Sequence, residues 1–351
     1  GPESHHWTPG RGGSVTVYFK TIDLLPGYSY DALPDGSFVF IPTEFPVWTE
    51  TLEIKDLEDF LNNVFCSGGA YQLRANQIFI TGRVEVPGNL EINAADRFEI
   101  LENGYLQVGG YRAWIRDGRT VSVQSPNIRI KGTLSTSGID YFWWGGGHYR
   151  GNGGSIILET NELTLTGALS ASGGYSHNRV PGGRGGSITI TSKRGVLSGG
   201  ITAEGGRSFR NRGGDGGTIR INIRNLTLNN VISVNAGLGG SYHYYVYGPG
   251  TGGKIRIEYE NISIEKNFQP RALPDGDVEF VPLSLSTGKD LVLEDLEDLL
   301  NNVAEYSPEN KSYVVRARNL SVAGRVILPG NLTVDVEEKF EILNGGSLEG
   351  G

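Results

Sequence analysis

The sequence predicts an all-β protein built as a parallel β-helix, in which short strands stack coil upon coil. Three observations carry this prediction. Paired glycines begin at 153, 185, 216 and 252, so they recur at spacings of 32, 31 and 36 residues. Each pair leads into a segment where Ile or Leu alternates with other residues, which is the pattern of a half-buried strand. A second strand-turn-strand phrase follows each of these segments, so one period holds about three short strands.

A β-sandwich is the alternative, because it also consists of short strands separated by turns. It would not repeat one strand-turn-strand phrase at a fixed spacing. Stacked coils do so, because they place equivalent Ile and Leu side chains above one another, about 4.8 Å apart. The repeated phrases lie at 126–138, 161–174 and 224–237, with related ones at 75–86 and 317–328. The fixed register favours the β-helix.

A longer repeat encloses the short one. The motif ALPDG at 32–36 returns at 272–276, and GRGGSVTVYF at 10–19 is similar to GTGGKIRIEY at 250–259; both offsets are 240 residues. DLEDFLNNV likewise returns as DLEDLLNNV, and GRVEVPGNL returns as GRVILPGNL. Tandem copies of a unit of about 240 residues, in a longer parent protein, are the natural inference.

These repeats divide the chain into five segments. Residues 1–31 are expected to end one β-helix, 75–271 to form a stack of coils, and 317–351 to begin the next β-helix. Segments 32–74 and 272–316 are expected to be insertions that cap or join the stacks. Each insertion carries the DLED motif, with acidic residues in a first turn and apolar residues on one face, which predicts a short α-helix.

Composition excludes several classes of protein. Glycine provides 53 of 351 residues, about twice ordinary usage, yet hydrophobic residues still make up 38% and suffice for a core. The net charge of −8 argues against non-specific nucleic-acid binding, and the sequence has no apolar run long enough to insert into a membrane. Cys66 is the single cysteine, so the chain has no internal disulfide and a cysteine-based metal site is improbable.

The coil motif resembles that of a known class. GGRGGSITI at 182–190 and its relatives within 75–265 and 317–351 are similar to the coils of right-handed parallel β-helices of the pectin-lyase-like class. The resemblance is strongest to bacterial surface proteins with GGxGGSIxI coils. It implies right-handed coiling and an extracellular or cell-surface location, but it implies no chemistry by itself.

Each coil carries an insertion of about ten residues beyond what a bare β-helix coil requires. The insertions leave equivalent corners of successive coils, so we expect their loops to line one ledge. Glycines are expected there to supply positive φ and close backbone approach. The insertions span 139–152, 175–184, 206–215 and 238–251.

The loops concentrate aromatic and cationic side chains. Aromatic faces stack on sugar rings and arginine pairs with carboxylate or sulfate, so this content predicts a polysaccharide or cell-surface glycan as ligand. Packing of the aromatics on one another is the alternative interpretation. The candidate ligand-binding residues are Tyr141, Phe142, Trp143, Trp144, His148, Tyr149, Arg150, Tyr175, Arg179, Arg184, Arg207, Phe209, Arg210, Tyr242, Tyr244, Tyr245 and Tyr247.

The sequence does not predict an enzyme. Pectin-lyase-like enzymes use clustered aspartates that hold calcium, or paired acids, whereas carboxylates are scattered over the central coils. Asp215, between glycines, is expected to form a turn. The five histidines are too far apart for a local metal motif. No cofactor is therefore predicted, although the acidic segments 53–60 and 293–300 leave calcium open.

The leading hypothesis is thus an extracellular tandem-repeat structural protein or adhesin, with a glycan-binding ledge and with neighbouring repeats of the same protein as partners. A polysaccharide lyase or glycoside hydrolase is the first alternative, and it would need a pair or cluster of acids on one face. A filament subunit whose ends dock head to tail is the second.

Overall fold

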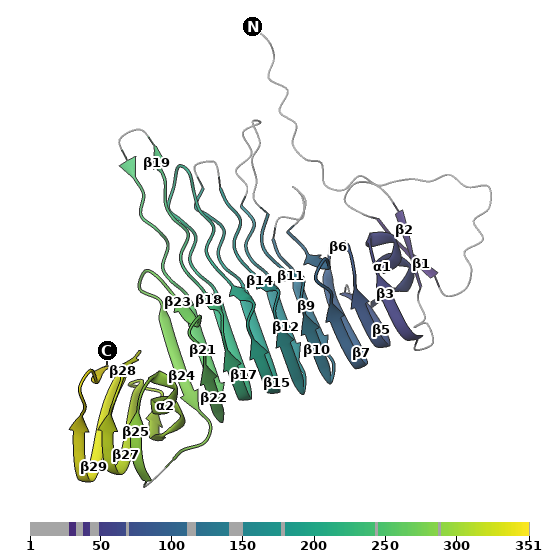
Figure 1. Cartoon of the computed structure of the whole chain (residues 1–351). Coiled ribbons are helices and arrows are strands. Elements are labelled where there is room, and N and C mark those ends of the chain that lie inside the picture. The colour runs from purple at the N-terminus through teal and green to yellow at the C-terminus, as the bar shows by residue number, and fades with distance from the viewer. Residues whose placement is uncertain are drawn as a thin grey trace, which may run out of the picture.

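The protein is nearly all β, and most of its strands pair in parallel (Figure 1). Antiparallel pairing joins only β1 to β2, β4 to β5, β19 to β20 and β26 to β27 within the described residues. The computed structural model describes residues 28–32, 38–42, 49–67, 70–110, 117–139, 150–176, 180–242, 245–286 and 289–350.

The main body consists of two sheets that run along its length. The seven-stranded sheet takes its strands in chain order, which means that each repeat adds one strand beside the last. Its strands are β6 (Arg83–Val86), β8 (Tyr105–Val108), β11 (Thr133–Ser135), β14 (Ala168–Ser170), β16 (Gly200–Thr202), β18 (Val231–Ser233) and β23 (Gln269–Arg271).

The thirteen-stranded sheet contains strands of two lengths. Long strands pair with two shorter ones, so that β15 pairs with β12 in its first half and with β13 in its second. The pairings β7–β9–β12–β15–β13–β10–β7 therefore form a closed path of parallel strands. The strands are β3 (Thr49–Ile54), β4 (Phe65–Ser67), β5 (Ala70–Ile80), β7 (Asn89–Ile100), β9 (Thr120–Gln124), β10 (Asn127–Ile130), β12 (Ser155–Glu159), β13 (Glu162–Leu165), β15 (Ser187–Leu197), β17 (Thr218–Leu228), β21 (Lys254–Tyr259), β22 (Asn261–Ile264) and β24 (Asp277–Pro282).

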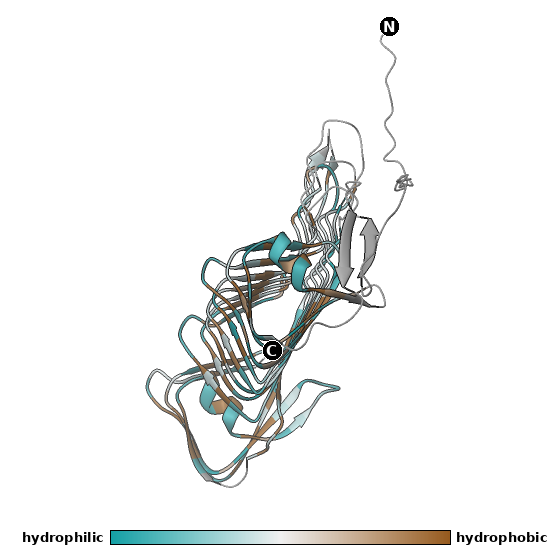
Figure 2. Cartoon of the chain, turned by 90° about the vertical axis from the view of Figure 1, so that its right-hand side faces the viewer, coloured by the Kyte–Doolittle hydropathy of each residue, from teal (hydrophilic) through white to brown (hydrophobic). Residues whose placement is uncertain are grey.

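Rows of aliphatic side chains form the core. Ile156, Ile188, Ile219 and Ile255 are direct partners in successive strands, and all four are buried. Burying such a side chain contributes about 1.5–3 kcal/mol. The prediction that equivalent Ile and Leu residues lie above one another is confirmed. Viewed along the stack, successive repeats overlay one another, and their loops extend together as a narrow layer (Figure 2).

A second section follows the main stack. Strand β27 pairs in parallel with β25 and β29, and β28 pairs in parallel with β30. Its strands are β25 (Lys289–Leu293), β26 (Val303–Ser307), β27 (Ser312–Val322), β28 (Arg325–Leu328), β29 (Asn331–Ile342) and β30 (Ser347–Gly350). Two small hairpins are separate from these sheets: β1 (Tyr28–Ala32) with β2 (Phe38–Pro42), and β19 (Ser241–Tyr242) with β20 (Tyr245–Val246).

The DLED motifs form the predicted short helices, α1 (Leu57–Asn63) and α2 (Leu296–Asn301). The aspartate before each helix accepts a backbone hydrogen bond at its N-terminus and so caps it. The stack extends further than the sequence predicts. Strands β3 and β24 lie in the segments expected to interrupt the coil pattern, yet both pair in parallel with strands of the stack. The paired glycines that precede strands of the other repeats do not precede β3 or β24.

Candidate functional site

The glycine-rich loops form an ordered layer beside the coils (Figure 1). Each loop has an outgoing leg after a strand of the seven-stranded sheet and a return leg before the next strand of the thirteen-stranded sheet. We call the described legs together the glycine layer. Its outgoing legs are 136–139, 171–176, 203–208 and 234–240, and its return legs are 150–154, 180–186, 212–217 and 247–253.

Backbone hydrogen bonds join legs of the same kind in successive loops. Among outgoing legs, Gly173 N donates to Glu204 O at 2.8 Å, and Gly205 N donates to Asn235 O at 2.8 Å. Return legs are joined in the same way, with Gly185 N donating to Asp215 O at 2.9 Å. Each kind of leg therefore forms its own row, parallel to the stacking direction.

A second set of bonds joins the two rows. Gly183 N donates to Gly174 O at 3.0 Å, Gly206 N to Gly183 O at 2.8 Å, and Gly214 N to Gly206 O at 2.9 Å. Gly237 N continues the series by donating to Gly214 O at 2.8 Å. The legs thus form a two-row array in which backbone groups satisfy one another.

The direction of these bonds repeats every three residues. Gly182 and Gly185 donate within the return row, whereas Gly183 and Gly186 donate to outgoing legs. Three residues per turn is the period of the polyproline II conformation. The sequence follows the same period as G-G-x triplets, GGRGGS at 182–187 and GGDGGT at 213–218. The x positions hold residues with side chains, Arg184 and Asp215 among them.

Lack of space, not positive φ, accounts for the glycines. A Cβ on Gly183 would lie 1.9 Å from the Gly151 O, and one on Gly214 would lie 1.9 Å from the Gly183 O. The expected positive φ is wrong for the legs: the described glycines with positive φ are Gly109, Gly110, Gly330 and Gly345, all outside them. Two backbone rows in contact leave no room for side chains, so the expected close approach is confirmed.

Polar side chains at x positions reinforce the return row. Asp117 Oδ1 accepts from Asn152 N at 2.7 Å, and Asn152 Oδ1 accepts from Arg184 N at 3.0 Å. Asp215 Oδ1 accepts from Thr251 N at 3.0 Å. The expected turn at Asp215 is wrong, because Asp215 lies in an extended leg and its carboxylate binds the next leg.

Asp215 also contacts two arginines, of which Arg184 is a predicted ligand residue. Arg212 Nη2 lies 3.0 Å from Asp215 Oδ1, and Arg184 Nε lies 3.8 Å from Asp215 Oδ2. The hydrogen bond from the Thr251 backbone, with smaller contributions from the Thr251 hydroxyl and both arginines, holds the pKa of Asp215 below its usual value despite partial burial, which raises it. These arginines therefore serve the layer as well as any ligand.

The loop tips expose apolar side chains. Phe209 is 48% exposed, Leu238 54%, Tyr245 70% and Val246 88%. The tips are adjacent, since Ser208 N donates to Leu238 O at 3.0 Å. The Arg210 guanidinium lies 5.7 Å from the Phe209 ring centroid, within range of a cation–π contact. Exposed apolar groups gathered at one place are typical of interaction surfaces.

The described legs and tips of the glycine layer carry eight of the predicted ligand residues: Arg150, Tyr175, Arg184, Arg207, Phe209, Arg210, Tyr245 and Tyr247. Sequence reasoning missed Leu238 and Val246. The triplet pattern contained a signal for Leu238, since Gly237-Leu238-Gly239 places it at an x position. Eight predicted residues lie outside the described part of the chain: Tyr141, Phe142, Trp143, Trp144, His148, Tyr149, Arg179 and Tyr244; for Tyr242 the structure describes the backbone alone.

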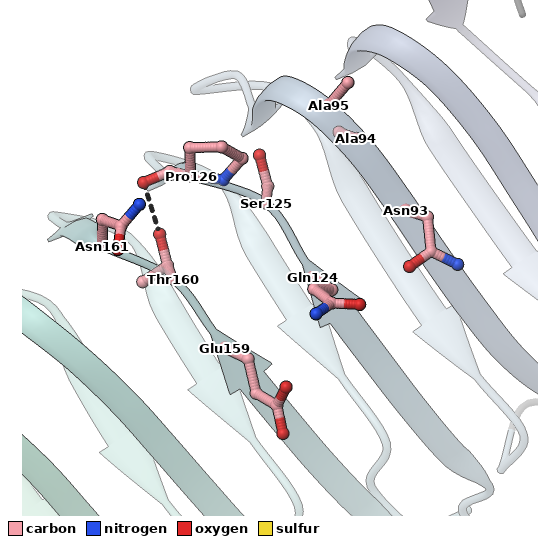
Figure 3. Close-up of a pocket in the computed structure, with 9 residues that line it drawn as sticks. All are labelled: Asn93, Ala94, Ala95, Gln124, Ser125, Pro126, Glu159, Thr160 and Asn161. Atoms are coloured by element: carbon pink, nitrogen blue, oxygen red, sulfur yellow. Dashed lines mark hydrogen bonds between the residues drawn. The ribbon is translucent and has the colours of Figure 1, made fainter.

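A separate hollow of about 420 Å³ lies where β9 and β12 end (Figure 3). Thr160 Oγ1 donates to Pro126 O at 2.9 Å across it. Glycoside hydrolysis by two carboxylates requires a second acid beside Glu159. The nine lining residues contain one carboxylate, so they do not form that pair: they are Asn93, Ala94, Ala95, Gln124, Ser125, Pro126, Glu159, Thr160 and Asn161.

Among the residues that the structure describes, no group of three or more His, Cys, Asp or Glu is placed to hold a metal ion. In the same residues, no helix has the length and apolar character needed to cross a membrane. No protein family model, no curated protein and no solved structure matches this chain. The resemblance to pectin-lyase-like β-helices therefore stays a prediction from the repeated motif.

Proposed function

We propose that this chain is part of an extracellular tandem-repeat adhesin in which a right-handed parallel β-helix carries a glycan-binding surface on its loop tips. The two sheets and the rows of stacked Ile support the solenoid, and parallel crossover connections are right-handed in nearly all proteins. Neighbouring repeats of the same protein are its structural partners.

The observation that carries the binding proposal is the exposure of large apolar side chains on a hydrogen-bonded support. Leu238, Tyr245 and Val246 expose large apolar side chains near Phe209, and exposed apolar groups gathered in one place are typical of a binding surface. Because the glycine layer fixes the legs beneath these tips, the side chains are held in place before a ligand arrives. Preorganisation of this kind lowers the entropy that binding costs.

The charge of the surface favours an acidic glycan. Arg207 and Arg210 lie near the apolar tips, and Asp215 is the carboxylate that Arg184 and Arg212 share. The surface therefore carries an excess of positive charge although the chain as a whole is acidic. Aromatic rings provide stacking for sugar faces, and guanidinium groups provide paired hydrogen bonds for carboxylate or sulfate.

A depletion assay on insoluble neutral and acidic polysaccharides tests this function. We expect an acidic polysaccharide to deplete the protein from solution, and Phe209→Ala/Tyr245→Ala to raise the dissociation constant by tenfold or more, which is about 1.4 kcal/mol. Phe340→Ala is the matched control, because Phe340 on β29 is also 48% exposed but lies far from the tips. It should bind like the unmodified protein.

Equal depletion by all three proteins, or by none, would contradict the proposal. Reducing sugar ends are counted in the same tubes. Their release would indicate the alternative function, a lyase or hydrolase.

A further inference from the structure

The hollow at the ends of β9 and β12 is built beside one row of outward side chains. Asn93 pairs with Gln124, and Gln124 pairs with Glu159, as direct partners in parallel strands. These side chains point out of the sheet, because the residue before each of them is buried in the core. Figure 3 shows the three side chains one after another on neighbouring strands. Two amides and one carboxylate therefore follow each other at the strand spacing of about 4.8 Å.

The corner beside this row is fixed by its own backbone and hydroxyl groups. Ser125 Oγ donates to Asn127 O at 3.2 Å, and Thr160 Oγ1 donates to Pro126 O at 2.9 Å. Asn161 N also donates to Pro126 O, at 3.1 Å. These bonds hold the shape of the hollow before a ligand arrives, which lowers the entropy that binding costs.

Four polar side chains of the hollow form no hydrogen bond or ion pair with another described residue. They are Asn93, Gln124, Glu159 and Asn161. Comparable groups elsewhere on β5 and β7 pair across the strands. Gln72 Nε2 donates to Glu91 Oε2 at 2.8 Å, and Gln77 Nε2 donates to Asp96 Oδ2 at 2.8 Å. The hollow therefore gathers polar groups that the fold itself does not use.

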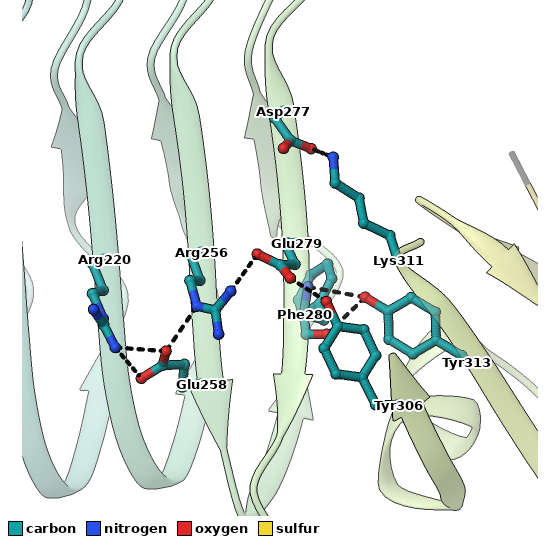
Figure 4. A network of polar contacts seen from close by, with 9 residues as sticks. All are labelled: Arg220, Arg256, Glu258, Asp277, Glu279, Phe280, Tyr306, Lys311 and Tyr313. Atoms are coloured by element: carbon teal, nitrogen blue, oxygen red, sulfur yellow. Dashed lines mark hydrogen bonds and ion pairs between the residues drawn. The ribbon is translucent and has the colours of Figure 1, made fainter. Parts of the chain in front are cut away.

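The same row ends in a carboxylate that the fold does neutralise (Figure 4). From Glu159 the row crosses β15 and β17 and reaches Glu258 in β21. Glu258 accepts from Arg220 Nη2 at 2.8 Å and from Arg256 Nε at 2.7 Å. Burial alone would raise the pKa of Glu258, but the hydrogen bonds from both arginines outweigh it and lower the pKa. Glu159 has no such partner in the described structure, so its charge is free to meet a ligand.

The corner of the next repeat carries a lysine that does not neutralise Glu159. Lys193 precedes Arg194, the residue that pairs with Glu162, and it forms no ion pair with Glu159. Lys193 also lies outside the lining of the hollow. The nine lining residues thus combine one carboxylate with no cationic side chain, so the hollow has a negative charge.

We propose that this hollow binds an amino sugar through its ammonium and hydroxyl groups. The Glu159 carboxylate accepts from the ammonium group, and such charge-assisted hydrogen bonds are stronger than neutral ones. The Asn93 and Gln124 amides both donate and accept, which matches sugar hydroxyls. Ala94 and Pro126 add apolar surface for the C–H groups of the ring. The volume of about 420 Å³ lies within the range of small-molecule sites, roughly 300–1,000 Å³.

This site is independent of the glycan proposed for the loop tips. The tips carry Arg207 and Arg210, which repel an ammonium group, whereas Glu159 in the hollow repels an acidic glycan. The two surfaces therefore select ligands of opposite charge.

Titration with glucosamine, followed through the NMR shifts of backbone amides, tests the site. Glucosamine should shift the amides of Gln124, Glu159 and Asn161. Glucose and N-acetylglucosamine lack the ammonium group and should bind roughly fivefold more weakly, the upper range for an exposed ion pair. Glu159→Gln should weaken glucosamine binding by the same factor and remove its advantage over glucose. Gln124→Ala should weaken all three sugars by roughly three- to fivefold, because it removes hydrogen bonds to hydroxyls.

Glu102→Gln is the matched control for the loss of one negative charge. Glu102 is exposed, lies between β7 and β8 outside the lining of the hollow, and forms no ion pair with another described residue. This variant should bind glucosamine like the unmodified protein. Lys193→Gln should not weaken binding, because the site does not use the lysine.

Equal binding of glucosamine and glucose would overturn the proposal, as would shifts confined to residues outside the hollow or no shifts at all. Glucosamine binding that Glu159→Gln leaves unchanged would do so too. Phe209→Ala/Tyr245→Ala should leave glucosamine binding unchanged, and Glu159→Gln should leave depletion by acidic polysaccharide unchanged. Failure at the hollow is therefore distinct from failure of glycan binding at the loop tips.

Discussion

The parallel sheets of the main stack and the glycine layer repeat with the same spacing but by opposite means. In the sheets, rows of Ile such as Ile188, Ile219 and Ile255 exclude water, and side-chain burial sets the spacing. In the glycine layer, side chains are absent at the contacts and backbone groups of Gly183, Gly206 and Gly214 bond directly. One repeat length is thus maintained by burial of side chains in one region and by backbone hydrogen bonds in another.

Truncating a core side chain should have the largest effect. Ile221 is buried and pairs with Ile190 and Ile257 in the neighbouring strands. Ile221→Ala removes its contacts and leaves a cavity, so the free energy of unfolding should fall by about 2–5 kcal/mol. Urea denaturation followed by circular dichroism measures this loss. A change below 1 kcal/mol would indicate that the rows do not stabilise the stack.

Adding one methyl group to the glycine layer should have a smaller and local effect. Gly214→Ala forces the legs apart, because the new Cβ would lie 1.9 Å from the Gly183 O. Overpacking of this kind costs about 1–3 kcal/mol. Amides of the legs, such as Gly237, should exchange faster, while those of β15 and β17 keep their protection. Uniform loss of protection over both regions would show that the layer and the coils unfold as one unit.

Removing the Asp215 carboxylate should cost about 1 kcal/mol locally, the value of a typical hydrogen bond. Since its folded pKa lies below the ordinary value of 3.8, its stabilisation is complete above that pH and is lost as pH falls through the lower folded pKa. The difference between the unmodified protein and Asp215→Ala, measured by exchange at Thr251, should therefore vanish in acid. Asp215→Asn should retain most of the stability without the pH dependence, because Asn152 already fills the equivalent role.

Gly200→Ala should have the smallest effect and is the control for the glycine layer. A Cβ at Gly200, in β16, would contact nothing within 4 Å. The substitution restricts the unfolded chain, so we expect either no change or a stabilisation of about 0.4–1 kcal/mol in the urea experiment. Destabilisation as large as that of Gly214→Ala would show that glycine content itself, and not contact between legs, matters.

Much of the arrangement of the parallel sheets was predictable from the sequence. The alternation around Ile188 and Ile219 predicts strands, and their fixed spacing predicts stacking. The position of the candidate surface also follows, since insertions at equivalent corners must project together. The exposure of Leu238 and Val246 was not predicted, because the predicted site was based on the aromatic and cationic residues of these loops and not on their aliphatic residues.

The sequence by itself therefore determined the repeated strands and their spacing, because a period of two within a period of 31 to 36 residues leaves little choice of register. The sequence predicts close approach at the glycines, but only the tertiary structure decided which backbone groups meet there. Bonds such as Gly214 N to Gly206 O join two legs of one loop, whereas Gly206 N to Gly183 O joins different loops. They form because the pairing of successive strands places the legs side by side. Contact between backbones then requires glycine at two positions of triplets such as Gly182-Gly183-Arg184 and Gly213-Gly214-Asp215, and leaves the third for a residue with a side chain.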